Sequence, residues 1–332
     1  MSKGGAQQFH CVQEAEAYRL LGMFVSSPKD FMSEIRFSVG RVILKAINGM
    51  DIASSQDPHI LIAEETLAQM RLHPYEYAVC QKASGTEKPS FVASLLEQDI
   101  PIDIDQDEWA DIISWTAGSM YGARGETVHA TIVNFVLAMM EHPEVQKKAH
   151  DEIDSVARNY FRSVRSANHP PKGVLVQAHL YSGKALMKEV LCWKVALLLG
   201  IVHRTTENDD FRGFNIPEGS IVLANAWAIA RDPENYDNLL NFVPEHFLSP
   251  RALDPENHVF GFGRRVCLGI HFAKNEVWIF IACLLWGLNF SIHIRFSVHC
   301  LLTVTLSHDK PNQFSSTYTR VGTNTDSPDP DN

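Results

Sequence analysis

Residues 260–269 read FGFGRRVCLG, a segment that places one cysteine among three glycines and two arginines just before a long apolar run. Gly261 and Gly263 permit turn conformations that are closed to other residues, and the apolar run from about 268 to 288 predicts a helix. Cys267 therefore lies near a helix N-terminus, where backbone N–H groups and the helix dipole favour an anion. The cysteine is either a small buried side chain or a thiolate held open for a ligand.

The other cysteines and the overall charge narrow the classes of protein that this chain can belong to. Six cysteines are scattered over 332 residues without a CxxC pair, so neither a disulfide framework nor a zinc site is expected. The net charge of −10 argues against nucleic acid as a partner, because broad nucleic-acid binding needs a basic surface.

Helical periodicity dominates the rest of the chain. Apolar residues recur on one helical face from Phe31 to Ala46, and Pro143 stands at a favoured first helical position. Two short strands are expected around a turn at residues 217–219, and a loop is expected over 159–182. The pattern predicts a mainly α fold with small β-sheets. Further helices are expected at 107–141, from 143 onward, at about 184–198 and at about 268–288.

The cysteine segment has a specific spacing. Phe260, Gly263, Arg265, Cys267 and Gly269 meet the pattern Phe-x-x-Gly-x-Arg-x-Cys-x-Gly, which random sequence meets in ~1 of 10⁶ windows. The segment resembles the haem-binding loop of the cytochrome P450 family, the haem-thiolate monooxygenases. The resemblance implies that Cys267 is the axial thiolate ligand of the iron in haem b (iron protoporphyrin IX), a ligand that favours O–O cleavage. It also implies that Arg265 pairs with a haem propionate, that Phe260 packs near the thiolate, and that Gly269 admits the flat ligand.

A second segment, Ala123-Arg124-Gly125-Glu126-Thr127, resembles the family pattern Ala-Gly-x-Asp/Glu-Thr in the long helix over the haem. The resemblance implies that Glu126 and Thr127 relay protons to bound dioxygen, whereas an exposed helical Glu-Thr pair is the alternative. Arg124 departs from the family, which has glycine there to open the helix for oxygen. A long cation at this position either blocks the pocket or points elsewhere.

A third segment also departs from the family. The family pattern Glu-x-x-Arg becomes Glu189-Val190-Leu191-Cys192, so a thiol stands where a buried arginine is expected. His246, in Pro244-Glu245-His246-Phe247, is then expected to contact Glu189 alone. Loss of one partner of a buried charge network typically costs roughly 3–5 kcal/mol, so we expect a destabilised haem domain or poor haem binding. By resemblance Arg204 reaches a propionate; the alternative is a surface arginine.

The resemblance implies an incomplete cytochrome P450 fold over most of residues 12–290. Residues 1–295 are expected to form a partial haem-binding monooxygenase domain without an N-terminal anchor or first sheet, and 296–332 a divergent, disordered tail. Members of the family sit on the endoplasmic reticulum membrane through an anchor, which has no counterpart before Gln8. The chain as printed therefore reads as cytoplasmic and soluble.

The function that this resemblance implies is haem-dependent monooxygenation. One oxygen atom from O₂ enters an apolar organic substrate, with electrons from NADPH through NADPH–cytochrome P450 reductase. The sequence most resembles fungal members of the family that oxidise secondary metabolites. The alternative is a truncated, non-catalytic haem-protein remnant with weak or no haem binding, which Arg124 and Cys192 favour.

Overall fold

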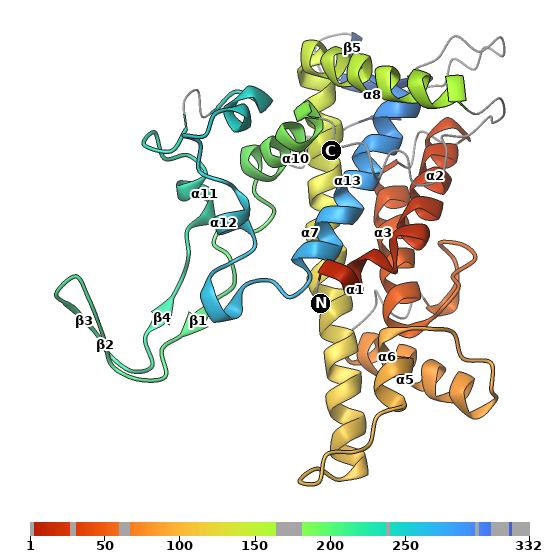
Figure 1. Cartoon of the computed structure of the whole chain (residues 1–332), viewed down its shortest axis with the longest axis vertical. Coiled ribbons are helices and arrows are strands. Elements are labelled where there is room, and N and C mark those ends of the chain that lie inside the picture. The colour runs from red at the N-terminus through yellow and green to blue at the C-terminus, as the bar shows by residue number, and fades with distance from the viewer. Residues whose placement is uncertain are drawn as a thin grey trace, which may run out of the picture.

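The computed structural model describes residues 3–26, 31–59, 67–163, 181–236, 240–295, 299–306 and 319–320. Most of these residues are helical, and the strands form small sheets, as expected from the sequence. Figure 1 shows helices arranged along one long helix, α7, with short helices and strands forming a separate part at its side. The helices are α1 (Lys3–Gln7), α2 (His10–Ser26), α3 (Phe31–Asn48), α5 (Leu67–Ala83), α6 (Phe91–Leu96), α7 (Gln106–Glu141), α8 (Pro143–Ser163), α10 (Tyr181–Trp193), α11 (Ala226–Ile229), α12 (Glu256–Val259) and α13 (Ile270–Gly287).

Helix α7 is the central element of the core. It begins after Asp105, whose carboxylate accepts the Glu108 backbone N–H at 2.8 Å, and ends before His142. Helices α2, α3, α8, α10 and α13 pack with it around one cluster of buried apolar side chains. Phe135 of α7 and Phe290 meet edge to face within that cluster.

Helix α13 is buried along most of its length. Its sequence from Val277 to Gly287 is entirely apolar, which is typical of a helix that is covered on several sides. It approaches α2 so closely that a Cβ at Gly287 would overlap the Leu21 side chain. One charged residue, Glu276, is fully buried within this helix.

Helix α10 ends at Trp193, earlier than the sequence pattern suggests. Two side chains bind its last carbonyl groups: Arg231 donates to the Trp193 carbonyl at 3.0 Å, and Asn134 donates to the Lys194 carbonyl at 2.9 Å. These bonds take the place of further helical hydrogen bonds. The chain then leaves the helix and reaches the first strand through Gly200, which has φ of +61°.

The small sheets are antiparallel. β1 (His203–Arg204) pairs with β4 (Ile221–Val222), and β2 (Asp209–Phe211) pairs with β3 (Phe214–Ile216). The two strands that flank residues 217–219 are therefore not partners of one another, because β2 and β3 form a hairpin of their own through Arg212 and Gly213, both with positive φ.

A third sheet follows α13. β5 (Leu288–Arg295) pairs with β6 (His299–Leu306), which pairs with β7 (Thr319–Arg320). Residues 299–306 thus form a strand where the sequence led us to expect a disordered tail. The sequence did not predict this strand, because it is held by pairing with β5, and such pairing is not visible in a local pattern. The rest of 307–332 apart from β7 lies outside the described residues, as do residues 164–180 of the expected loop.

Candidate active site

The cysteine loop, Phe260–Gly269, joins α12 to α13. Gly261 (φ +81°) and Gly263 (φ +54°) take left-handed conformations that favour glycine. A tight turn of helix covers Gly263–Arg265, and the Cys267 N–H donates to the Phe260 carbonyl at 2.7 Å. Gly269 then caps α13. The loop thus closes on itself and delivers Cys267 to the N-terminus of a buried helix, as expected.

Cys267 is a free, exposed thiol. Its neighbours Val266 and Leu268 are apolar and yet 40% and 81% exposed, and a Cβ at Gly269 would meet only the Cys267 sulfur, at 3.8 Å. An open thiol among exposed apolar side chains, beside a glycine that leaves room for a flat group, fits a large apolar ligand bound through sulfur. The donor is a soft one, suited to iron in haem.

The two arginines expected to hold propionates are both exposed. Arg265 lies in the tight turn of the cysteine loop. Arg204 lies in β1, and its guanidinium passes so close to Gly219 that a Cβ there would come within 3.0 Å of Nη2. The structure therefore leaves both cations open to solvent, where they are available to an anionic ligand.

Glu126 and Thr127 lie in the middle of α7, and each has a partner in the structure. Glu126 Oε1 accepts from Arg36 Nη2 of α3 at 2.5 Å, in an ion pair whose two side chains are 66% and 47% exposed. The Thr127 hydroxyl donates to the Ala123 carbonyl at 3.0 Å within the helix. The expected acid–alcohol pair is thus engaged by α3 and by its own helix.

Arg124 points into the contact between α7 and α13. Its guanidinium forms an ion pair with Glu276 of α13 and lies 3.7 Å from the centroid of the Phe272 ring. Arg124 is 9% exposed and Glu276 is fully buried. The side chain therefore points toward α13, the helix that follows the cysteine loop.

Glu189 of α10 is buried and has no lysine or arginine partner among the described residues. The carboxyl group accepts the Val243 N–H at 3.0 Å, and His246 Nδ1 lies 3.3 Å from its other oxygen. Burial raises the pKa of Glu189 to about 8 and that of the neighbouring Cys192 thiol to about 12. His246 is the side-chain partner, as expected, and a backbone N–H is added.

Cys192 cannot replace a guanidinium in this network. Its thiol is only a weak donor, and it donates to the Ala230 carbonyl at 3.8 Å. Lys194 does not substitute for the missing arginine either, since its Nζ lies 4.7 Å from the centroid of the Trp193 ring and its side chain is exposed. The carboxyl group of Glu189 is therefore held by a backbone N–H and a histidine.

The sequence reading missed two residues at this site, Arg36 and Glu276. Arg36 left no local signal, because its partner Glu126 is 90 positions away along the chain. Glu276 did leave one: it is an acidic residue four positions after Phe272, on the buried face of an apolar helix. A charge at such a position calls for a partner.

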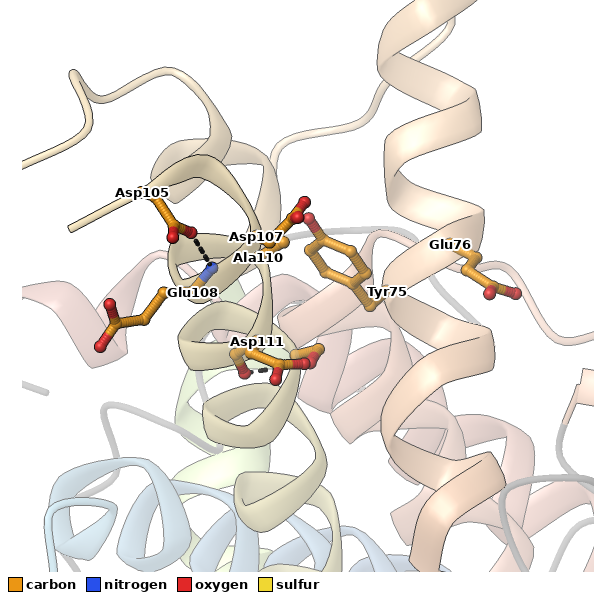
Figure 2. Close-up of a pocket in the computed structure, with 8 residues that line it drawn as sticks. Tyr75, Glu76, Asp105, Asp107, Glu108, Ala110 and Asp111 are labelled. Atoms are coloured by element: carbon orange, nitrogen blue, oxygen red, sulfur yellow. Dashed lines mark hydrogen bonds between the residues drawn. The ribbon is translucent and has the colours of Figure 1, made fainter.

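A cavity of about 460 Å³ lies elsewhere, at the N-terminus of α7. Figure 2 shows Tyr75 of α5 facing this cavity beside Asp107 and Asp111, while the Glu108 carboxylate points away. The lining is acidic and wide open to solvent, with no residue of the cysteine loop. It has none of the features of the site described above.

Within the described part of the chain, none of the helices has the length and apolar character needed to cross a bilayer.

Comparison with known proteins places these features in context. A family model described as Cytochrome P450 matches residues 75–311. Cytochrome P450 monooxygenase claT from Ampulloclitocybe clavipes is 29% identical over 338 residues, which cover 88% of this chain and 66% of that protein. A cytochrome P450 monooxygenase from Armillaria gallica is 30% identical over 345 residues, which cover 87% of this chain and 63% of that protein. The chain thus spans less than two thirds of the length of these relatives.

Other similar proteins support the same grouping. Cytochrome P450 monooxygenase 58 from Postia placenta is 40% identical over 215 residues, which cover 62% of this chain and 38% of that protein. A solved zebrafish cytochrome P450 with abiraterone aligns with a TM-score of 0.68 at 21% identity, covering 93% of this chain and 83% of that one. The structural match confirms the expected fold.

Proposed function

Since the chain belongs to the cytochrome P450 family, we propose that it is a haem-thiolate monooxygenase in which Cys267 supplies the thiolate. One oxygen atom of O₂ would enter a C–H bond of an apolar organic substrate and the other would leave as water. The two electrons come from NADPH through a flavoprotein reductase, and two protons are consumed. The exposed thiol at the start of α13, within the full loop pattern, carries this proposal.

The chain's own residues have separate tasks in this proposal. Cys267 holds the iron of haem b, and Arg265 and Arg204 orient the group by pairing with its propionates. When bound, haem supplies the activation of dioxygen. Phe260 and Gly269 shape the loop around the sulfur, and Gly263 permits the turn before it.

Proton delivery is assigned to Glu126 and Thr127. The Thr127 hydroxyl holds a proton that it now donates to the Ala123 carbonyl, and Glu126 is the acid that can replace it. Arg36 competes for the Glu126 carboxylate, because the two form an ion pair in the structure. The relay therefore requires Glu126 to leave Arg36, and this exchange is possible because both side chains are largely exposed.

The reduced, carbon-monoxide-bound spectrum of the purified, haem-supplemented chain tests the proposal. We expect the absorbance of thiolate-ligated iron, and we expect Cys267→Ser to abolish it. Cys80→Ser is a matched control, since Cys80 is also a free exposed thiol but lies in α5. Identical spectra for the Cys267→Ser variant and the parent chain would overturn the assignment of the ligand.

The cation-free Glu189 network supports a second candidate, a haem protein that does not turn over. A buried carboxyl group without its arginine weakens α10, which packs on α12, the helix just before the cysteine loop. The two candidates differ in one measurement: a thiolate spectrum together with NADPH-dependent substrate oxidation supports the monooxygenase, and the spectrum without oxidation supports the second candidate. The reductase, the substrate class and the relation to fungal secondary metabolism belong to the proposal.

The domain division is also a proposal. We propose that residues 1–295 form the haem-binding unit and that 296–332 are an extension, of which residues 299–306 pair with β5 and lie within the family match that ends at 311. Limited proteolysis should release the extension and leave the haem spectrum in the larger fragment.

A further inference from the structure

Arg124 and Glu276 bring two opposite charges into the middle of the core. Arg124 lies two positions before Glu126 on α7, and Glu276 lies nine positions after Cys267 on α13. Their ion pair therefore joins the helix of the proposed proton relay to the helix that carries the proposed thiolate. Figure 1 shows α7 and α13 side by side, and the two helices pack against each other.

The surroundings of Arg124 fix the direction of its side chain. The guanidinium lies over the Phe272 ring, which packs on the Phe9 ring with centroids 5.2 Å apart. The Phe272 carbonyl accepts a hydrogen bond from buried Gln13 at 3.1 Å, so the backbone that carries the ring is held by α2. A cation over the face of a fixed aromatic ring is stabilised by the ring electrons. Arg124 is thus held within the core, whereas the cysteine loop is open.

The positive charge of Arg124 and the negative charge of Glu276 cancel, so the pair has no net charge. Burial lowers the pKa of the Arg124 guanidinium, because the charged form loses its hydration. Glu276 offsets that cost as the counter-ion, and each charge becomes expensive once the other is removed. Neither residue can therefore change alone without leaving an unpaired charge between the two helices.

We propose that the Arg124–Glu276 pair is a positioning device that holds the Arg124 guanidinium against α13, the helix that follows the proposed thiolate, and keeps the net charge between α7 and α13 at zero. This inference rests on the proposed function, because it assigns the pair a role toward the haem iron. Arg124 is then a positioning residue. Its pairing with Glu276 accommodates a cation where the family pattern has glycine.

The electrostatic effect of the pair at the iron can be measured through the affinity of iron ligands. Azide is an anion and imidazole is neutral, so the ratio of their affinities for the oxidised, haem-loaded protein reports the local charge. Glu276→Gln leaves the cation unpaired and should raise the azide-to-imidazole affinity ratio about fivefold. Arg124→Met leaves the carboxylate unpaired and should lower the ratio by about the same factor. The double variant should return to the parent ratio.

A second buried ion pair supplies the control for a merely structural role. Glu16 and Arg41 join α2 to α3 at 2.9 Å, with side chains that are about as buried as those of Arg124 and Glu276. Glu16→Gln should lower the thermal midpoint in the same way as Glu276→Gln and leave the ligand ratio unchanged. If Glu276→Gln and Arg124→Met leave the azide-to-imidazole ratio unchanged, the proposal is wrong. It is also wrong if the double variant of these two residues keeps a shifted ratio.

A measurement without haem separates this proposal from the proposed function. In the haem-free protein, Glu276→Gln should lower the thermal midpoint by about 10 °C. The double variant should recover most of that loss, because no unpaired charge remains. Recovery together with no thiolate spectrum in the parent chain would overturn the monooxygenase and keep the pair. Strictly additive losses would overturn the pair even if the spectrum is present.

Discussion

The molecule contains two buried carboxyl groups in opposite situations. Glu276 on α13 is fully buried and has a cation, Arg124, as its partner. Glu189 on α10 is 3% exposed and has a backbone N–H and a histidine, but no guanidinium. Where the family pattern has an arginine near Glu189 this chain has Cys192, and where it has a glycine near Glu276 this chain has Arg124. Both departures change the partner of a buried acid.

The difference shows how the partner decides the state of a buried carboxyl group. Without a cation, burial raises the pKa of Glu189 to about 8, so near neutral pH the group keeps its proton. With a cation in contact, the cost of burial is offset by attraction, and removal of either partner exposes the full cost. We therefore expect the two sites to respond in opposite ways to the same substitution.

The largest expected effect comes from the matched pair Glu276→Gln and Glu189→Gln. Glu276→Gln should lower the free energy of unfolding by about 3–5 kcal/mol, because Arg124 stays buried with no counter-ion. Glu189→Gln should leave it unchanged or raise it at pH 7, since a glutamine can accept the Val243 N–H and incurs no cost for staying neutral. Urea unfolding at pH 7 measures both, and equal losses at the two sites would contradict the comparison.

The helices and the cysteine loop that surround these acids are largely predictable from the sequence. The periodicity of α3, α7 and α13 and the spacing of the cysteine loop are local patterns, and the structure agrees with them. The partners of charged residues are not local. The contacts of Glu276 with Arg124 and of Glu126 with Arg36 depend on how α7 meets α13 and α3. The strand pairing of β1 with β4, across the β2–β3 hairpin, was missed for the same reason.

The next effect is a pH dependence that Glu189 contributes. In the unfolded chain its carboxyl group releases the proton above about 4.5, whereas in the folded chain it keeps the proton up to about 8. Between these values the unfolded state binds fewer protons, so the free energy of unfolding falls as pH rises. The stability present below pH 4.5 is thus lost progressively and no further above 8. The rise in the pKa sets a ceiling of about 5 kcal/mol on this loss, and we expect about 3 kcal/mol.

Chemical denaturation at a series of pH values from 5 to 9 measures this dependence. Glu189→Gln should flatten the part of the curve that belongs to this group. A parallel curve for the variant and the parent would show that another group is responsible.

A smaller gain is expected when the missing cation is supplied. Cys192→Arg should lower the pKa of Glu189 and raise the free energy of unfolding at pH 8 by about 1–2 kcal/mol, because attraction is offset in part by the burial of the guanidinium. Haem occupancy should rise with it. Cys192→Met, which adds volume without charge, is the control. A variant that gains as much from methionine as from arginine would show that packing, not charge, limits this site.

The smallest effect concerns the third acid, Glu126, which is exposed and paired with Arg36. Arg36→Met should change the free energy of unfolding by less than about 1 kcal/mol, since an exposed ion pair is screened by water. In the haem-loaded protein it should increase the product formed per NADPH, because Glu126 loses its competitor for the proton relay. Arg19→Met, which removes another exposed arginine from an ion pair with Glu16, is the control for both measurements. If Arg36→Met destabilised the protein as much as Glu276→Gln, then burial would not be what separates these acids, and the contrast between Glu189 and Glu276 would need another cause.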